Sequence, residues 1–319
     1  MGLASLDRKI TEWRLRTRTL ALGQRTRVMG VVNITPDSFS DGGLYFVPEA
    51  AVKHALGLLE QGADLLDLGA ESTRPGARVG GDTATVSADE EQARLLPVIE
   101  GILKARPDAI ISVDTYKAAT AHSALQAGAE IVNDVSGLAW DKSLAAVCAA
   151  SGAGLVLMHT RGKPSEWKTQ QKLAPDALLE MVRSGLANNL HTATAAGIAT
   201  ENVVLDPGYG FGKRFGENYA LLANQRELLA LGRPLVAGVS RKSFLVNRLA
   251  ERKGPDDDVQ ALKEARENAS LAAMTAAILN GASIVRVHAV RAAVDAAQVA
   301  DSILGAITAS EGAPGFGSE

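Results

Sequence analysis

Short apolar runs alternate along the chain with longer alanine-rich segments, in which apolar residues recur three and four positions apart. Eight runs are rich in β-branched residues and leucine, and each ends in polar residues or glycine. They are 28–35, 64–69, 110–115, 131–136, 154–159, 203–208, 235–240 and 284–288. Near-continuous apolar runs are typical of strands buried on both faces, and the intervening period is that of amphipathic helices. The pattern predicts a parallel sheet covered by helices.

The helical segments carry their own end signals. The clearest segments span 48–62, 87–105, 176–197 and 267–281. Gly62, Gly128 and Gly281 each stand just before the next apolar run, where a helix C-cap is expected. Eight strand–helix units without a long linker predict a single-domain α/β fold, the (β/α)8 barrel, with an open Rossmann-type sheet as the alternative.

The two ends of the chain fall outside the barrel pattern. Residues 1–27 include the alternating segment WRLRTRTLALG, which predicts a short hairpin or arm closing the bottom of a barrel over 28–307. Residues 308–319 are expected to form a disordered tail. Two connections, 70–87 and 160–175, are long for this fold, and long loops are usually functional or mobile.

Composition narrows the class of partner. The 319 residues are 46% hydrophobic with a formal net charge of −3, and no long basic block is present. This balance argues against a nucleic-acid surface, and no uncharged apolar stretch is long enough for a membrane span. The N-terminal segment lacks the apolar core of a signal peptide. We expect a cytoplasmic protein with small-molecule partners, in which the one cysteine, Cys148, is a buried structural thiol.

Polar residues at the ends of three apolar strands suggest a binding site, because a barrel of this kind places its site at the carboxyl ends of the strands. Asp114, Asn133 and Asp206 stand where an unpaired carboxylate or amide is costly to bury. Two acceptors and an amide suit a flat heterocycle with several N–H donors, and Lys242 could donate to a ring nitrogen or oxygen. The alternative is that these residues pair only with one another or with the backbone.

A second set of residues near the strand ends suits anions. Arg74 stands in a glycine-rich loop, Arg286 and His288 on the last strand, and Ser240 opens a helix with two basic residues. Such groups bind phosphate or carboxylate. Asn33 offers a neutral oxygen ligand that would suit a Mg²⁺ ion already held by a diphosphate and waters.

Several common catalytic motifs fail on inspection. The segment 208–214, GYGFGKR, resembles a P-loop, but Pro207 replaces its first glycine and Arg214 its serine or threonine. The five histidines lack zinc-site spacing, and no G-x-S-x-G nucleophile elbow is present. The sequence therefore predicts neither a nucleotide loop, nor a zinc site, nor a serine nucleophile.

Seven segments at predicted strand ends together resemble the dihydropteroate synthase family. They are VMGVVNITPDSFSDGG, GADLLDLGAESTRPGA, VDTYK, IVNDVSG, LDPGYGFGK, GVSRKSF and VRVHAV, which follow in the family's order within 28–305. The resemblance implies a barrel enzyme with a Mg²⁺ ion, commonly a homodimer. It also implies condensation of p-aminobenzoate with 6-hydroxymethyl-7,8-dihydropterin diphosphate, which yields 7,8-dihydropteroate and pyrophosphate.

The same resemblance implies roles for individual residues. The pterin pocket would consist of Asp114, Asn133, Met158, Asp206, Lys242 and Arg286. The diphosphate would contact Asn33, Thr73, Arg286 and His288, with Asn33 at the metal. The p-aminobenzoate would lie against Phe39, Pro75, Phe211 and Lys242, with Ser240 near its carboxylate. Asp114, Lys242 and Arg74 would be catalytic; Asp114 would stabilise the pterin cation left by the diphosphate, while loops 36–43 and 70–82 close to exclude water.

Two other functions share part of this pattern. A methyltetrahydrofolate-dependent methyltransferase acting on a corrinoid protein would keep the Asp and Asn pterin contacts, but is not expected to carry the STRPG loop and SRK segment. A non-catalytic pterin-binding paralogue should have lost Asn33, Arg74, Lys242 or Arg286, and all four are present. One departure concerns 160–162, Thr-Arg-Gly, where many relatives have Met-Gln-Gly or similar; it leaves the local loop contacts open.

Overall fold

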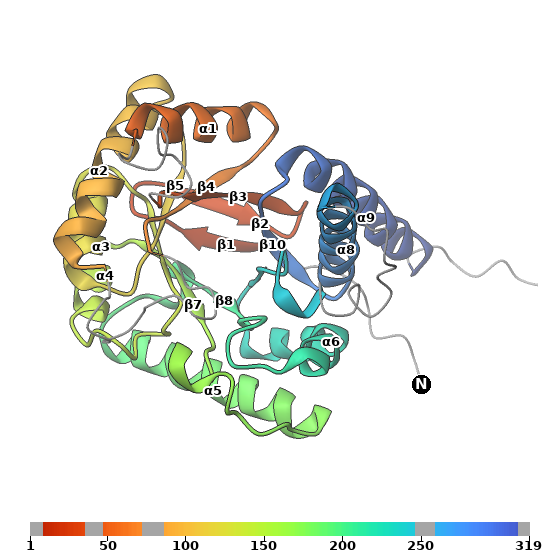
Figure 1. Ribbon diagram of the computed structural model, residues 1–319. Coiled ribbons are helices and arrows are strands. Elements are labelled where there is room, and N and C mark those ends of the chain that lie inside the picture. The colour runs from red at the N-terminus through yellow and green to blue at the C-terminus, as the bar shows by residue number, and fades with distance from the viewer. Residues whose placement is uncertain (1–8, 36–46, 72–85, 246–258, 312–319) are drawn as a thin grey trace, which may run out of the picture.

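The computed structural model describes residues 9–35, 47–71, 86–245 and 259–311. Its centre is a closed barrel with the strand order β10-β3-β4-β5-β6-β7-β8-β9 and parallel pairing throughout (Figure 1). The strands are β3 (Arg27–Asn33), β4 (Leu65–Gly69), β5 (Ile111–Asp114), β6 (Ile131–Asp134), β7 (Gly154–Met158), β8 (Val203–Asp206), β9 (Leu235–Ala237) and β10 (Ala282–Val287). The predicted (β/α)8 or TIM barrel is confirmed, and the open sheet is excluded because β10 pairs with β3.

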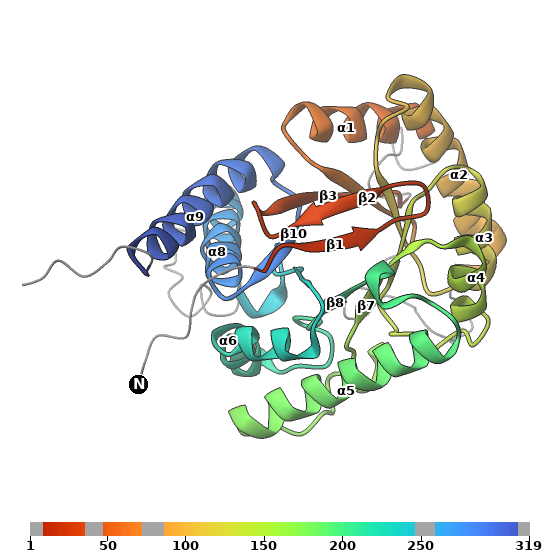
Figure 2. The ribbon, with the colours of Figure 1, turned by 180° about the vertical axis from the view of Figure 1, so that it is seen from behind.

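Helices form a ring around the barrel, as both ribbon views show (Figures 1 and 2). They are α1 (Pro48–Glu60), α2 (Ala88–Ala105), α3 (Ala118–Gln126), α4 (Leu144–Ser151), α5 (Pro175–Ala195), α6 (Phe215–Ala223), α8 (Val259–Leu279) and α9 (Val290–Glu311). Short 3₁₀ helices are η1 (Pro164–Glu166), η2 (Thr200–Asn202) and η3 (Gln225–Leu231). Gly62, Gly128 and Gly281 have φ values of 102°, 112° and 94°, so the predicted glycine turns before the strands are confirmed.

Several predicted boundaries differ from the structure. The run 235–240 was expected to be one strand, but β9 ends at Ala237, and the chain then turns through Arg241 at a φ of 57°. The turn leaves Ser240 and Lys242 at the mouth of the barrel rather than within the sheet. Helix α9 runs to Glu311, four residues into the expected tail 308–319, whereas 312–319 lie outside the described residues.

The expected N-terminal hairpin is confirmed. Strands β1 (Thr11–Arg14) and β2 (Thr19–Leu22) pair antiparallel and lie across one end of the barrel (Figure 2). Trp13 is fully buried there, and its indole Nε1 donates to the carbonyl oxygen of Asn202 at 2.8 Å. Its apolar cluster includes residues from seven barrel strands: Met29, Leu65, Ile131, Val156, Val204, Val236 and Ile284. The hairpin therefore closes the amino-terminal end of the barrel.

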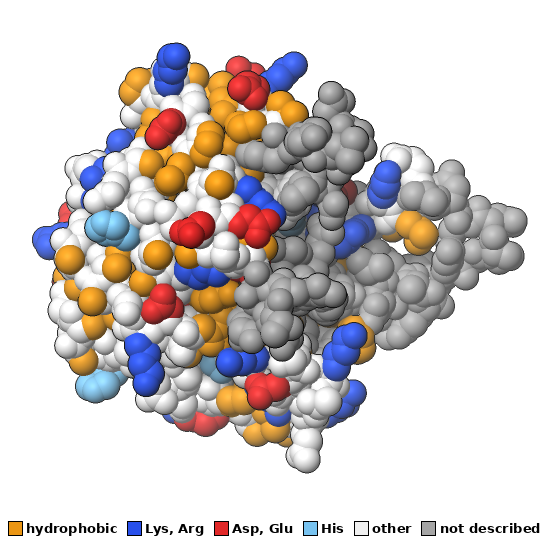
Figure 3. Space-filling view, turned by 60° about the vertical axis from the view of Figure 1, so that its left-hand side comes forward, with side chains coloured by type: hydrophobic (Ala, Val, Ile, Leu, Met, Phe, Trp, Pro, Cys, Tyr) orange, Lys and Arg blue, Asp and Glu red, His pale blue; other side chains and the backbone are white. Residues whose placement is uncertain are grey.

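The main apolar core lies between the sheet and the helices. Cys148 on α4 is 1% exposed within this core, so the expected burial of its thiol is confirmed. Burial raises the pKa of this thiol to about 12. No described helix is both long enough and apolar enough to cross a membrane. On the described part of the face in Figure 3, acidic and basic side chains are interspersed. This mixture of charge fits the expectation that the partners are small molecules.

Candidate active site

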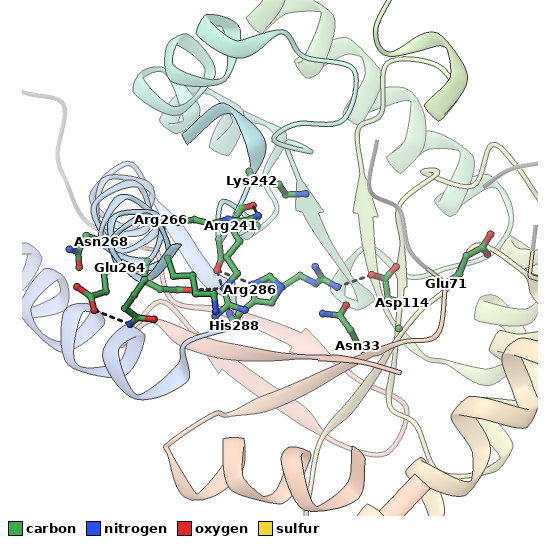
Figure 4. Close-up of a pocket in the computed structure, with 16 residues that line it drawn as sticks. Asn33, Glu71, Asp114, Arg241, Lys242, Glu264, Arg266, Asn268, Arg286 and His288 are labelled. Atoms are coloured by element: carbon green, nitrogen blue, oxygen red, sulfur yellow. Dashed lines mark hydrogen bonds and ion pairs between the residues drawn. The ribbon is translucent and has the colours of Figure 1, made fainter. Parts of the chain in front are cut away.

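A cavity of about 690 Å³ opens at the carboxyl ends of the barrel strands. Six residues predicted to form the site line it: Asn33, Asp114, Ser240, Lys242, Arg286 and His288 (Figure 4). They come from four segments, namely β3, β5, the turn after β9, and β10 with the residue that follows it. The closed barrel brings together residues that are more than 250 positions apart in the sequence.

The guanidinium of Arg286 reaches across the barrel interior from β10. Its Nε donates to Oδ2 of Asp67 at 2.5 Å and its Nη2 to Oδ2 of Asp114 at 2.7 Å. Asp67 is fully buried on β4 and also accepts from Ser112 Oγ at 2.7 Å and from Asn133 Nδ2 at 3.0 Å. The buried charge of Asp67 is therefore paired, and it holds Arg286 and Asn133 in fixed orientations.

Asp67 is a site residue that sequence reasoning missed. The sequence-based prediction concerns residues at strand ends, whereas Asp67 stands inside the apolar strand β4. The available signal was a charged residue within a continuous apolar run, because such a charge must find a buried partner.

The three strand-end residues expected to meet a ligand already have protein partners. Asn133 is bonded to Asp67, Asp114 to Arg286, and Oδ1 of Asp206 accepts the Gly208 N–H at 2.7 Å. Each carboxylate has further lone pairs. Because of these pairings, the acceptors are already oriented before any ligand arrives.

Burial brings the pKa values of two cavity groups, Asp114 and Lys242, close to pH 7. Desolvation raises the pKa of Asp114 to about 7, although the neighbouring Arg286 guanidinium lowers it. Desolvation lowers the pKa of Lys242 to about 8, with a further lowering by Arg286, while Asp206 and Asp114 raise it. Perturbed acid and base groups in one cavity are typical of an enzyme site.

An apolar wall adjoins the cavity. Lys242 Nζ lies 4.0 Å from the ring centroid of Phe211, and Phe211 packs edge-to-face on Trp167 with 5.1 Å between centroids. Met158 belongs to the same small cluster. Asn133, Met158, Asp206 and Phe211 do not line the 690 Å³ cavity in the described part of the chain. Phe211 lies against Lys242 and Asp206 is next to Gly238, Met158 is in the cluster of Phe211, and Asn133 pairs with Asp114 in the sheet.

His288 carries no positive charge at neutral pH. Burial, followed by the nearby guanidinium of Arg241, lowers the pKa of His288 to about 3. Its Nδ1 lies 3.0 Å from Ser240 Oγ. Without a bound anion, His288 therefore offers a neutral imidazole, and its place at the diphosphate stays a prediction.

Asn33 is the predicted metal ligand. It stands at the end of β3, beside Arg286 and Asp114 in Figure 4. No group of three or more His, Cys, Asp or Glu residues suited to a metal occurs in the described chain. One amide oxygen fits a Mg²⁺ ion that keeps its waters and is bound mainly by substrate phosphates, rather than one held in a protein cage.

Four predicted site residues lie outside the described residues. They are Phe39, Thr73, Arg74 and Pro75, in the segments 36–46 and 72–85. The expected closure of loops 36–43 and 70–82 concerns the same segments. Their assigned roles stay predictions.

The chain leaves β4 through a buried ion-pair network. Glu71 lines the cavity and pairs with Lys117, whose Nζ also lies 3.1 Å from Glu91. Glu91 in turn accepts from Thr120 Oγ1 at 2.7 Å. This network fixes the described end of the segment before 72–85 against the beginning of α3.

The departure at 160–162 has a local structural explanation. The Thr160 hydroxyl donates to the carbonyl oxygen of Gly162 at 3.0 Å, and Gly162 has a φ of 76°. Arg161 lies 3.8 Å from Glu217. The loop is therefore folded on itself and against α6.

Comparison with known proteins agrees with this geometry. The sequence model of the pterin binding enzyme family matches residues 29–288. A Synechocystis dihydropteroate synthase is 40% identical over 283 residues, which cover 88% of this chain and 91% of that protein. A structure of Xanthomonas albilineans dihydropteroate synthase with 4-aminobenzoic acid has a TM-score of 0.77 at 38% identity, covering 96% of this chain and 100% of that one. Another, in complex with 7,8-dihydropteroate, has a TM-score of 0.74 at 36% identity, covering 95% and 100%.

The barrel and the Asp, Asn, Lys and Arg side chains gathered at the carboxyl ends of its strands, together with the family match, define a pterin-binding enzyme. Within that class, the chain belongs to the dihydropteroate synthase family, as predicted from its seven sequence segments.

Proposed function

We propose that this chain condenses 6-hydroxymethyl-7,8-dihydropterin diphosphate with p-aminobenzoate to give 7,8-dihydropteroate and pyrophosphate. The observation that carries this proposal is the hydrogen-bonded set of Asp67, Asp114, Asn133 and Arg286 beside Lys242, in a chain of the dihydropteroate synthase family. The bound 4-aminobenzoic acid and 7,8-dihydropteroate of the Xanthomonas structures support the choice of substrate and product.

The pterin ring would bind against the groups oriented by Asp67. The Asn133 amide and the Asp114 and Asp206 carboxylates would meet the polar edges of the ring, and Lys242 would donate to a ring nitrogen or oxygen. Arg286 would lie over a ring face with Met158 near the pocket wall. Two hydrogen bonds to carboxylates hold the guanidinium of Arg286, so little conformational entropy remains to be lost when the ring binds.

The diphosphate would bind at the side of the cavity formed by Arg286, His288, Asn33 and Thr73. The neutral imidazole of His288 would donate a hydrogen bond through its Nε2 rather than add charge. Asn33 would hold the Mg²⁺ ion. When bound, this ion neutralises charge on the departing diphosphate.

The reaction would proceed when the carbon–oxygen bond to the diphosphate breaks and its electron pair leaves with the diphosphate. The cation that remains is delocalised into the pterin, and the Asp114 carboxylate would stabilise it. The arylamine then forms the carbon–nitrogen bond and loses a proton. Phe211, Phe39 and Pro75 would flank p-aminobenzoate beside Lys242, with Ser240 near its carboxylate, while Arg74 and the loops 36–43 and 70–82 would cover the reacting atoms.

Two further properties belong to this proposal. We propose that the protein acts as a homodimer, which sedimentation equilibrium in an analytical ultracentrifuge can test. We also propose a cytoplasmic location, which cell fractionation can test.

The activity is tested by following pyrophosphate release from the pterin diphosphate and Mg²⁺, with and without p-aminobenzoate. Release coupled to dihydropteroate formation is expected in the unmodified protein. Asp114→Asn and Lys242→Met should each lower kcat/KM by about 100-fold or more, because each removes a charge that acts on the transition state.

Exposed residues at the end of α2 and in the turn that follows it provide matched controls. Asp108→Asn and Lys104→Met make the same chemical changes at exposed positions and should leave kcat/KM unchanged. Near-normal rates in Asp114→Asn or Lys242→Met would contradict the pocket assignment. Pterin binding without turnover in the unmodified protein would instead indicate a silent paralogue, and methyl transfer would then be assayed.

A further inference from the structure

A buried lysine lies outside the cavity and has no part in the proposed reaction. Lys213, in the turn between β8 and α6, is only 5% exposed. Its Nζ donates to the carbonyl oxygen of His159 at 2.7 Å. Burial lowers the pKa of Lys213 well below its ordinary value, while the carboxylate of Asp206 raises it. A buried ammonium is costly to keep charged, so its contacts indicate what it is there to hold.

The Lys213 contact closes a small hydrogen-bonded unit between β7 and β8. The His159 N–H donates to the carbonyl oxygen of Asp206 at 2.9 Å, and its own carbonyl accepts from Lys213. The Asp206 carboxylate accepts from the Gly208 N–H at 2.7 Å. A Cβ added to Gly208, whose φ is 70°, would lie 2.0 Å from the His159 carbonyl oxygen and 2.9 Å from Lys213 Nζ. The turn, the peptide and the ammonium are therefore packed without spare room.

The same turn is held at its other end by α6. Asn218 Oδ1 accepts from the Gly210 N–H at 2.7 Å, and Asn218 Nδ2 donates to the Lys213 carbonyl oxygen at 3.1 Å. Phe211, at the proposed p-aminobenzoate site, lies between these two points. Lys213 thus sits where the turn that carries both Asp206 and Phe211 is fixed.

Charged groups of both signs surround the pair formed by Asp206 and Lys213. The groups that face Asp206 are Lys242, Lys213 and Arg286, with the phenol of Tyr209 on the same turn. The groups that face Lys213 are Asp206, Lys242, Glu217, Arg161 and His159. Arg286 and Lys242 line the cavity, where substrates would contact them, whereas Lys213 does not. Lys213 is instead 5% exposed, and its Nζ already donates to the carbonyl oxygen of His159.

We propose that Lys213 is a positioning residue for pterin binding. Its side-chain nitrogen clamps the His159 peptide against the Asp206–Gly208 turn and, when protonated, places a positive charge near the Asp206 carboxylate. The inference rests on the proposed role of Asp206 as a pterin acceptor. Each charge of the pair favours the other, so a pterin that donates N–H groups to Asp206 also favours the charged form of Lys213.

The test measures the affinity of 6-hydroxymethyl-7,8-dihydropterin by calorimetry from about pH 5 to about pH 9. Lys213→Met fills the same space without charge. Because it leaves Asp206 easier to protonate, the pH at which affinity falls on the acid side should rise by about one unit. The affinity at pH 7 should fall by up to about tenfold, and the loss should shrink as the pH rises.

Two further variants separate charge from packing. Lys213→Gln keeps a donor for the His159 carbonyl but removes the charge, so its acid limb should shift as in Lys213→Met. Lys213→Arg keeps the charge, and its acid limb should match the unmodified protein even if its overall affinity is lower. The arginine and glutamine variants suffice if the methionine variant does not fold. Lys172→Met, at an exposed lysine, is the control and should bind as the unmodified protein does.

A loss of affinity that is the same at every pH, or an acid limb that is identical in the arginine and glutamine variants, would overturn the proposal. Unchanged affinity in Lys213→Gln and Lys213→Met would do the same. Asp206→Asn separates this failure from a failure of the pocket assignment. If Asp206→Asn loses pterin affinity while the Lys213 variants keep it, only the inference about Lys213 is wrong.

Discussion

At the scale of single residues, the site depends on Arg286 and the two carboxylates that hold it. Against the opposing effect of burial, Asp67 and Asp114 raise the pKa of the Arg286 guanidinium above its ordinary value. Asp67 also receives Asn133, so one buried carboxylate orients a cation and an amide that come from β10 and β6. A pocket that must bind a flat, polar ring is thereby rigid before the ring arrives.

The pKa values of Asp114 and Lys242 predict a narrow pH optimum. Burial raises the pKa of Asp114 to about 7, so kcat/KM should fall as the pH drops through that value and the carboxyl group becomes neutral. Burial lowers the pKa of Lys242 to about 8, so kcat/KM should also fall as the pH rises through that value and the ammonium loses its proton. The pH dependence of kcat/KM, which reports on the free enzyme, should be bell-shaped.

Lys242→Arg provides the check on that assignment, because an arginine stays protonated throughout the range. Its alkaline limb should disappear, whatever its residual rate, while the acid limb stays in place. An alkaline limb that persists in Lys242→Arg would show that another group is responsible.

At the scale of elements, sequence patterns predicted which segments form strands and helices, but not the residues at which they begin and end. The eight apolar runs gave the eight barrel strands, because a strand buried on both faces needs an unbroken apolar segment. The predicted strand 235–240 was too long, since β9 ends at Ala237. An apolar residue that packs over the mouth of the barrel cannot be told from sequence apart from one that pairs in the sheet. Helix α8 begins at Val259, ahead of the expected 267, because its first turns carry many charges and little apolar pattern.

The turn after β8 shows how an element positions site residues. Gly208 adopts a φ of 70°, and a Cβ there would meet the His159 carbonyl oxygen at 2.0 Å. Gly208→Ala should therefore move the turn and weaken the N–H bond that orients Asp206. We expect pterin affinity to fall by about tenfold or more, and the free energy of unfolding to fall by at least the roughly 1 kcal/mol that a left-handed alanine costs.

Gly216→Ala is the matched control in the same region. Gly216 lies in α6, and a Cβ added there would meet nothing within 4 Å. The added methyl group should leave pterin affinity unchanged and, as alanine favours helix, should not destabilise the protein. Equal pterin affinity in the two variants, measured by calorimetry, would contradict the positioning role of the turn.

At the scale of the whole molecule, the two ends of the barrel have different tasks. The carboxyl ends of the strands carry the cavity, whereas the hairpin β1–β2 covers the amino-terminal end. The hairpin could be predicted from its alternating pattern, and so could six of the residues that line the cavity, from the strand ends and the family segments. The network around Asp67 could not, because its partners Ser112, Asn133 and Arg286 become neighbours only when the barrel closes.

This division predicts that the hairpin stabilises the barrel without serving the reaction. Trp13 is fully buried among the inward-facing residues of the barrel strands, and its indole bonds to the Asn202 carbonyl oxygen. Trp13→Ala should lower the free energy of unfolding by about 3–5 kcal/mol, measured by urea denaturation, because it leaves a large cavity and an unpaired carbonyl. Ile10→Ala, at a residue that is 62% exposed beside the same hairpin, should change the free energy of unfolding by less than about 0.5 kcal/mol.

The reaction itself should not depend on the hairpin. Below the temperature at which Trp13→Ala unfolds, the KM values of this variant for both substrates should stay within about twofold of the unmodified protein, because distant sites usually act independently. A higher KM in Trp13→Ala without a loss of stability would contradict this prediction. It would mean that the hairpin affects substrate binding at the opposite end of the barrel.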